Sequence, residues 1–187
     1  HEAGIEGRRL GGGQVRVENC QPDVLACLLD RMREAGVLFD VGSDWIETQT
    51  CDRRLQQPRS TDVTTQPYPG FPTDLQAQFM AVLCLAKGNS IITEKIFPDR
   101  FMHVAELSRM AANLRKEGPH VIISGIEKLV AAPVMASDLR ASAALVVAAL
   151  AAHGETIVNR VYHIDRGYEK IEEKLNAVGA KIERQIV

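Results

Sequence analysis

Arginines and aspartates gather where helices are expected to begin. Arg100 and Arg166 each follow an aspartate, and Arg140 stands in the first turn of a helix that Ser137 is expected to cap. A cation in a first turn opposes the helix macrodipole and costs about 0.3–1 kcal/mol. A bound anion would offset this cost, because helix N-termini and guanidinium groups both bind carboxylate or phosphate. Three such helix starts, if they converge, predict a site for a ligand with several negative groups.

A local alternative stays open for these arginines. Asp99, Asp138 and Asp165 could neutralise the neighbouring guanidinium groups in ordinary surface ion pairs. The spacing alone favours these local pairs over the anion site.

Asp74 and Asp138 occupy corresponding places, each directly after a candidate helix cap. Thr73 and Gln76 fit a capping box, and an acidic residue in a first turn favours the helix in any case. As a functional group, either aspartate could serve as a general base or a hydroxyl acceptor at the rim of a cleft. The proline-rich stretch 66–72 is expected to fix the direction of Asp74.

The composition excludes several classes of protein. With 187 residues, 45% hydrophobic and 25% charged, the chain can fold around one core. The net charge of -2 indicates neither nucleic acid nor membrane lipid as a partner, and no apolar stretch reaches the length of a membrane span. The four cysteines lack metal-ligand spacing, so we expect reduced thiols, a cytoplasmic location and no metal. No nucleotide-binding or esterase motif is present, and we expect no cofactor.

A repeat organises the rest of the chain. Glycines at 13, 88 and 154 each open a β-branched run, and aspartates at 23, 99 and 165 each precede an amphipathic run with helical spacing. The glycine periods are 75 and 66 residues and the aspartate periods are 76 and 66, so the two measures agree. The full unit is strand, helix, strand, helix, strand, strand, which places the chain in the α/β class.

The repeat sets the expected domain boundaries. One domain covers 11–187, with copies at about 11–60, 61–127 and 128–187. The first copy lacks its first helix, and the third ends at Val187 before its hairpin closes, so the domain is expected to be truncated at both ends. The most apolar helices, near 79–86 and 141–152, belong inside and the sheets outside. Residues 1–10 contain Ile5-Glu6-Gly7-Arg8, which matches a protease-cleavage linker, and are treated as a tag or linker remnant outside the fold.

Several motifs carry a family resemblance. The stretches 71–78, 89–94, 100–103, 106–110, 137–142 and 162–168 resemble enolpyruvyl transferases, and in particular the group that acts on UDP-N-acetylglucosamine. The resemblance implies an inside-out α/β barrel of βαβαββ units, paired with a second, N-terminal domain across a cleft. That N-terminal domain, with its cysteine-bearing loop, is absent from this sequence.

The resemblance also implies an activity and a set of residues. Members transfer an enolpyruvyl group from phosphoenolpyruvate to the 3-hydroxyl of UDP-N-acetylglucosamine and release phosphate, the first committed step of peptidoglycan synthesis. Asp74 would deprotonate the hydroxyl and Asp138 would sit beside the reacting carbons. Arg166 would be catalytic together with these two aspartates. The residues that would bind substrate are Asp74 for the sugar hydroxyl, Arg100, Arg140 and Arg166 for the phosphate and carboxylate, and Ile96 and Phe97 for the sugar nucleotide.

Two other hypotheses remain open. One is the shikimate-pathway enolpyruvyl transferase, 3-phosphoshikimate 1-carboxyvinyltransferase, against which the block 71–78 argues. The other is a non-catalytic module that binds a sugar nucleotide. In either enolpyruvyl transferase, we expect the chain alone to be inactive, since half a cleft leaves the ligands in water.

Overall fold

The computed structural model describes residues 2–7, 14–49 and 57–185. Its strands form three sheets, ordered β11-β1-β10-β9, β2-β4-β3 and β5-β6-β8-β7. The strands are β1 (Glu2–Gly7), β2 (Arg16–Glu18), β3 (Phe39–Val41), β4 (Trp45–Thr48), β5 (Val63–Thr64), β6 (Asn89–Thr93), β7 (Asn113–Glu117), β8 (His120–Ser124), β9 (Val134–Met135), β10 (Gly154–Asn159) and β11 (Ile182–Gln185). The α-helices are α1 (Ala26–Glu34), α2 (Gln76–Leu83), α3 (Met102–Arg109), α4 (Leu139–Ala151) and α5 (Ile171–Ala177), and short 3-10 turns are η1 (Pro22–Leu25), η2 (Thr73–Leu75) and η3 (Val161–His163).

The second repeat is the complete βαβαββ unit. Strands β5 and β6 are parallel and are joined through α2, while β8 pairs antiparallel with both β6 and β7. Each expected helix stop adopts a positive φ, at Gly36, Ala111 and Gly179, with values of 87°, 69° and 98°. Ala111 therefore takes the left-handed conformation that glycine provides in the other two copies. The three positions are structurally equivalent, as the repeat predicts.

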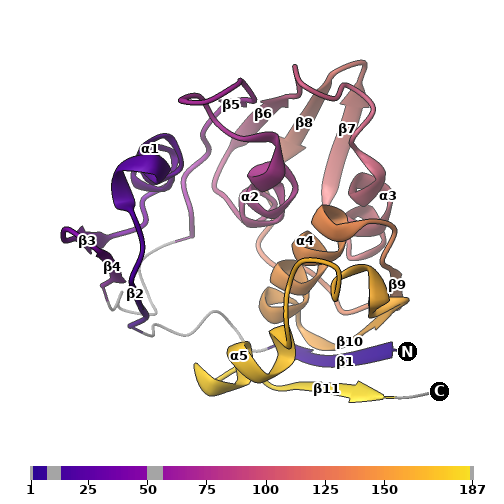
Figure 1. The fold of residues 1–187 in the computed structure, drawn as a ribbon. Coiled ribbons are helices and arrows are strands. Elements are labelled where there is room, and N and C mark those ends of the chain that lie inside the picture. The colour runs from indigo at the N-terminus through magenta and orange to yellow at the C-terminus, as the bar shows by residue number, and fades with distance from the viewer. Residues whose placement is uncertain (1, 8–13, 50–56, 186–187) are drawn as a thin grey trace.

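Strand β1 completes the third repeat from the other end of the chain. In the second repeat β8 lies between β6 and β7, and in the third β1 lies in the same way between β10 and β11, antiparallel to both. Figure 1 shows the N-terminal and C-terminal strands side by side in this sheet. Residues 1–10 were expected to lie outside the fold. This expectation is wrong for residues 2–7, which form β1 and pair with β10 on one side and with β11 on the other. The hairpin partner expected beyond Val187 is supplied by β1.

Ile5 provides a direct test of this role for β1. Its side chain is fully buried in the core, whereas Ile157 on the adjacent strand β10 is 37% exposed. We expect Ile5→Ala to lower the free energy of unfolding by about 2–5 kcal/mol, the usual cost of removing buried methyl groups. Ile157→Ala is the matched control and should cost less than about 1 kcal/mol. Urea unfolding monitored by circular dichroism measures both, and equal effects would place residues 2–7 outside the cooperative unit.

Helices α2 and α4 form the centre of the molecule. They pack against each other more extensively than any other pair of helices. Residues of α4 that are at most 4% exposed occur on all sides of the helix: Ala141, Ser142, Ala143, Ala144, Leu145, Val146, Ala148 and Ala149. Figure 1 shows the three sheets arranged around these helices. The expected order, with apolar helices inside and sheets outside, is confirmed.

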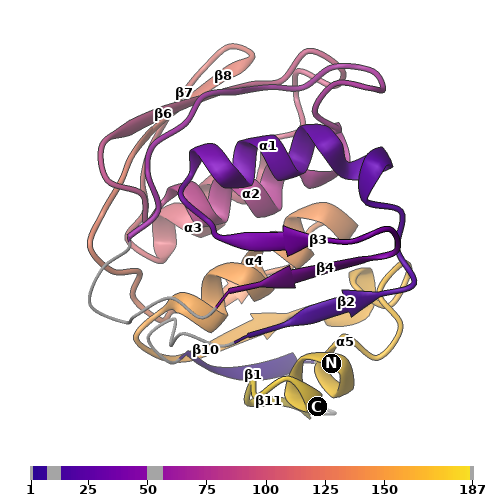
Figure 2. The same ribbon diagram turned by 90° about the vertical axis from the view of Figure 1, so that its left-hand side faces the viewer.

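The first repeat is the incomplete one. It consists of η1, α1 and the sheet β2-β4-β3, which Figure 2 shows on the face turned to the viewer. Val17 and Val41 flank Ile46 in one row of this sheet, and they are 53% and 38% exposed. In the second and third repeats a central helix covers the corresponding strands, and the described residues of the first repeat include no such helix, which leaves these valines exposed. Across the described residues, no helix has the length and apolar character needed to cross a membrane.

Candidate active site

Asp74 brings together arginines from two repeats. Its carboxylate Oδ1 accepts a hydrogen bond from Arg140 Nε and lies 3.5 Å from Arg100 Nη1. Asp74 belongs to η2 before the central helix of the second repeat, and Arg140 belongs to the first turn of α4 in the third. Helices α2 and α4 pack side by side (Figure 1), and the contact between Asp74 and Arg140 places their first turns next to each other. We call Asp74, Arg100 and Arg140 the aspartate–arginine cluster.

The cluster is open to solvent on the carboxylate side. The side chain of Asp74 is 61% exposed, while those of Arg140 and Arg100 are 33% and 22% exposed. An ion pair this accessible contributes little to stability, about 0–1 kcal/mol. Its arrangement offers two guanidinium groups for an anion and one carboxylate for a hydroxyl proton.

Arg100 is held on two sides. Its Nη1 donates to Thr73 Oγ1 at 3.1 Å, and its guanidinium carbon lies 4.0 Å from the centre of the Phe97 ring. Stacking on an aromatic face suits the planar guanidinium and leaves its remaining N–H groups free to bind a ligand. The ring of Phe97 is otherwise half exposed, and Ile96 beside it is partly buried.

Asp138 is the N-cap of α4. Its carboxylate Oδ1 accepts from the backbone N–H groups of Arg140 and Ala141 at 2.8 and 2.9 Å. The expected cap at Ser137 is therefore wrong by one residue. The expected capping box at the other helix is also wrong, because Thr73 Oγ1 bonds Glu94 and Arg100, and Gln76 is buried with its amide unpartnered within the described residues. Asp138 lies two residues before Arg140, and its place beside the reacting carbons stays a prediction.

The local ion pairs that spacing favoured do not form. Asp165 pairs with Arg184 at 2.8 and 2.9 Å, and this bidentate contact lowers the pKa of Asp165. Arg166 itself is exposed and takes no part in the ion pairs of the described residues. The next residue, Gly167, packs so closely on Leu139 that an added Cβ would lie 2.7 Å from it. Arg166 is thus carried next to the start of α4 but outside the aspartate–arginine cluster, and its role stays a prediction.

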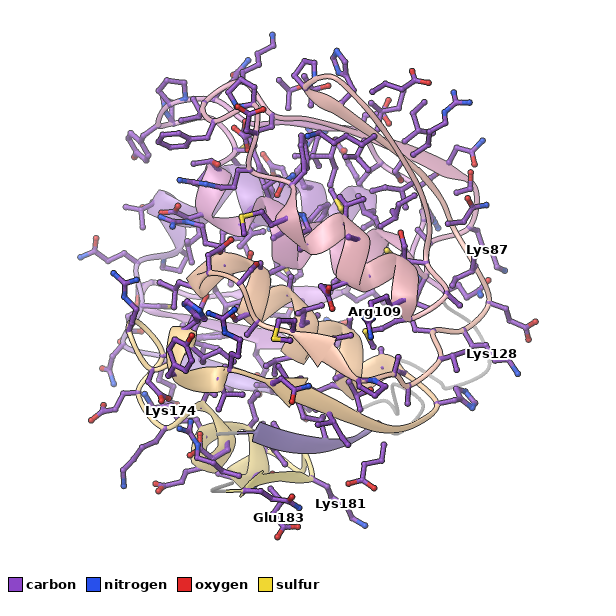
Figure 3. The ribbon with its side chains drawn as sticks, turned by 90° about the vertical axis from the view of Figure 1, so that its right-hand side faces the viewer. Lys87, Arg109, Lys128, Lys174, Lys181 and Glu183 are labelled. Carbon is purple, nitrogen blue, oxygen red and sulfur yellow. The ribbon has the colours of Figure 1, made fainter. Side chains whose placement is uncertain are left out.

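Other cations lie apart from the cluster. Figure 3 labels Lys87, Arg109, Lys128 and Lys174, which are exposed and spread over α3, α5 and the loops around them. Within residues 2–7, 14–49 and 57–185, no three His, Cys, Asp or Glu side chains form a group that could hold a metal ion. In the part of the chain that the structure describes, the cluster around Asp74 brings an exposed carboxylate together with arginines from two repeats.

His103 lies buried behind the start of α4. The residue is 2% exposed, and its Nε2 has no hydrogen-bond partner within the described residues. Burial lowers the pKa of His103 to about 4, although the negative charge of Asp138 opposes the shift. A neutral imidazole is therefore the form that the folded protein accommodates.

This burial predicts a pH dependence of stability. The unfolded chain binds a proton at His103 below its ordinary pKa of 6.5, while the folded chain binds one only near 4. Between these values the unfolded state gains protons, so the free energy of unfolding should fall by about 1.4 kcal/mol per pH unit as the pH drops. Urea unfolding at pH 7, 6 and 5 measures how the free energy of unfolding changes with pH. This slope should be smaller in His103→Leu than in the parent chain. His153→Gln, which changes an exposed histidine, should keep the full slope; a slope unaffected by His103→Leu would contradict the assignment.

Comparison with known proteins decides the family. A family model described as EPSP synthase (3-phosphoshikimate 1-carboxyvinyltransferase) matches residues 9–175. The chain belongs to this EPSP synthase family. The resemblance drawn from the sequence motifs is confirmed, as is the enolpyruvyl transferase fold.

Within the EPSP synthase family the similar relatives share one name. UDP-N-acetylglucosamine 1-carboxyvinyltransferase from Psychrobacter sp. (strain PRwf-1) is 51% identical over 180 residues, covering 96% of this chain and 41% of the relative. The proteins of the same name from Beijerinckia indica and Vibrio vulnificus are 55% and 54% identical over 175 residues. The chain spans about 40% of the length of these relatives.

Solved structures of enolpyruvyl transferases match the fold. The enolpyruvyl transferase NikO from Streptomyces tendae superimposes with a TM-score of 0.82 at 27% identity, covering 95% of this chain and 41% of NikO. EPSP synthase from Acinetobacter baumannii superimposes with a TM-score of 0.70 at 16% identity, covering 94% of this chain and 43% of that one. The second likeness concerns the fold alone.

Sequence reasoning gave Glu94 no role, although it lies in the motif 89–94, and it took Thr73 for a helix cap. Glu94 is fully buried and accepts four hydrogen bonds, and Thr73 connects it to Arg100. The available signal was weak: Glu94 directly follows the strand Asn89–Thr93, and a carboxylate buried there would require partners.

Proposed function

We propose that this chain forms one side of the active site that transfers the enolpyruvyl group of phosphoenolpyruvate to the 3-hydroxyl of UDP-N-acetylglucosamine. Phosphate is released, and the product belongs to the first committed step of peptidoglycan synthesis. The names of the relatives at 51–55% identity support this substrate pair. The contact of one carboxylate with guanidinium groups from two repeats is the observation that carries the proposal.

The chemistry of the cluster suits this reaction. Phosphoenolpyruvate carries a phosphate and a carboxylate, and Arg100 and Arg140 provide two charged forks to bind them. Asp74 contacts both arginines. There its carboxylate can accept the proton of the sugar hydroxyl while the hydroxyl oxygen attacks C2 of phosphoenolpyruvate. The C2–phosphate bond then breaks while C3 loses a proton and the double bond re-forms, and fixed cations around the phosphate stabilise the charge that develops on it as it leaves.

Further roles follow from the same proposal. Phe97 and Ile96 would contact the sugar nucleotide, and Arg166 would complete the anion site from the loop beside α4. The rest of the longer protein would supply the opposite wall of the cleft and the proton donor for C3, so the chain alone is expected not to turn over. Free thiols at Cys20, Cys27 and Cys84 support a cytoplasmic location, and Cys51 lies outside the described residues.

A chimera tests the proposal. The segment of the Vibrio vulnificus relative that aligns with this chain, at 54% identity, is replaced by the chain itself. We expect the chimera to release phosphate from phosphoenolpyruvate only in the presence of UDP-N-acetylglucosamine. Phosphate release with shikimate 3-phosphate instead would favour the shikimate-pathway enzyme. Binding of UDP-N-acetylglucosamine without any turnover would favour a non-catalytic module.

The shikimate-pathway alternative has weaker support. Although the family model carries the name of that enzyme, the solved EPSP synthases are only 16% identical to the chain. The relatives named for UDP-N-acetylglucosamine share more than half of its residues.

A further inference from the structure

Glu94 occupies an unusual position at the end of β6. Its side chain is fully buried, yet it carries a carboxylate. Oε1 accepts from Thr65 Oγ1 at 2.6 Å and from the backbone N–H groups of Ile96 and Phe97 at 2.8 and 3.0 Å. Oε2 accepts from Thr73 Oγ1 at 2.9 Å. Four donors from two segments of the second repeat therefore converge on one buried anion.

Besides its contact with Asp74, Arg100 is held by Thr73 and Phe97, and both of these residues lead back to this carboxylate. Thr73, which accepts from Arg100 Nη1, donates its hydroxyl proton to Glu94 Oε2. Phe97, whose ring lies under the guanidinium, donates its backbone N–H to Glu94 Oε1. Among the described residues, no hydrogen bond or ion pair joins Glu94 to Arg100 directly, so we consider its influence on that guanidinium through these two residues.

The charge state of Glu94 determines the direction of these bonds. Burial alone would raise the pKa of Glu94, but the hydrogen bonds from Thr65, the loop N–H groups and Thr73 outweigh it and lower the pKa. An ionised carboxylate only accepts hydrogen bonds, so the Thr73 hydroxyl must donate to it. Because the Thr73 hydroxyl proton is donated to Glu94, the lone pairs of Thr73 Oγ1 are available to accept a hydrogen bond from Arg100.

We propose that Glu94 is a positioning residue that fixes Arg100 for anion binding through its hydrogen bonds to Thr73 and to the 96–97 loop. The part played by Arg100 in binding phosphoenolpyruvate rests on the function proposed above. The orientation of Arg100 by Glu94 does not, because it concerns the free protein. The two claims can therefore be tested separately.

The first experiment observes Arg100 in the chain without ligand. In a ¹⁵N-labelled sample, the Nε–Hε signal of Arg100 is assigned by its loss in Arg100→Lys. Glu94→Gln keeps the size of the side chain but replaces one of the two acceptor oxygens with an NH2 group, which only donates. The hydrogen bonds to Thr73 and to the 96–97 loop cannot all be kept, so we expect the Arg100 signal to shift or broaden. Asp62→Asn is the matched control, because Asp62 Oδ1 accepts from the backbone N–H of Ile91 in β6 at 2.7 Å and has no link to Arg100.

The second experiment measures kinetics in the chimera. Glu94→Gln should raise KM for phosphoenolpyruvate about tenfold, the loss expected when a charge-assisted contact is misplaced, with kcat within about threefold of the parent. Asp62→Asn should leave both constants unchanged. If Glu94→Gln does not fold, Thr73→Val removes one of the two arms and should shift the Arg100 signal in the same direction.

The outcomes separate the two claims. An unmoved Arg100 signal in Glu94→Gln and Thr73→Val overturns the positioning role, whatever the kinetics show. A moved signal with unchanged KM supports the positioning role and removes Arg100 from the anion site. An inactive chimera counts against the proposed function, and the Arg100 signal still decides the role of Glu94.

Discussion

Asp74→Asn should lower kcat of the chimera by about 10²–10⁴-fold, the contribution typical of a positioned general base. The asparagine side chain keeps the size of the aspartate and can still bond the sugar hydroxyl, but it cannot take up the proton. Affinity for UDP-N-acetylglucosamine should therefore change less than tenfold. Steady-state kinetics and calorimetric titration measure the two quantities.

A paired aspartate elsewhere provides the control for Asp74. Asp30 on α1 contacts Arg33 at 3.2 Å and is exposed to a similar degree, 62% against 61%. Asp30→Asn should leave kcat unchanged. A parallel loss of affinity and kcat in Asp74→Asn would instead assign Asp74 to ground-state binding alone.

Arg140→Ala should lower kcat/KM for phosphoenolpyruvate by about 100-fold or more, since it removes one charged fork from a site that must bind two anionic groups. Arg140→Lys keeps the charge and loses the fork, so it should recover only part of the activity. Arg33→Ala, which breaks an exposed pair on α1, is the control and should have no effect.

A double substitution tests whether Asp74 and Arg140 act as one unit. Because the two side chains are directly bonded, the effects of Asp74→Asn and Arg140→Ala should not add. Additive losses, or unchanged use of phosphoenolpyruvate in Arg140→Ala, would separate Arg140 from the site.

The order of elements within each repeat could be predicted from spacing. Glycines and aspartates at matching intervals preceded strands and helices. The structure places equivalent strands at Gly88 and Gly154 and equivalent left-handed helix stops that include Ala111, whereas Gly13 lies outside the described residues. Strand β1 could not be predicted in this way. It completes a repeat whose other strands lie at the opposite end of the chain, and its sequence, Glu2–Gly7, has two glycines and little β-branched character.

The candidate site was predictable in part for a similar reason. The charged residues at helix starts stood out, but spacing pointed to partners next to them in sequence, whereas Asp74 pairs with Arg140, 66 positions away. Such pairing depends on how the central helices dock, which no local pattern reports. Glu94 was missed because a single glutamate after a strand resembles any solvated residue until its burial is known.

The docking of α2 on α4 has a consequence for how the molecule responds to its ligands. The aspartate–arginine cluster lies across the interface between the second and third repeats, so it forms only while α2 and α4 are packed together. A small molecule with two negative groups that binds both Arg100 and Arg140 would cross-link the second repeat to the third. Because such a ligand binds only when the two repeats are packed together, its binding would stabilise the packing of α2 on α4. Separation of these helices would in turn release the ligand.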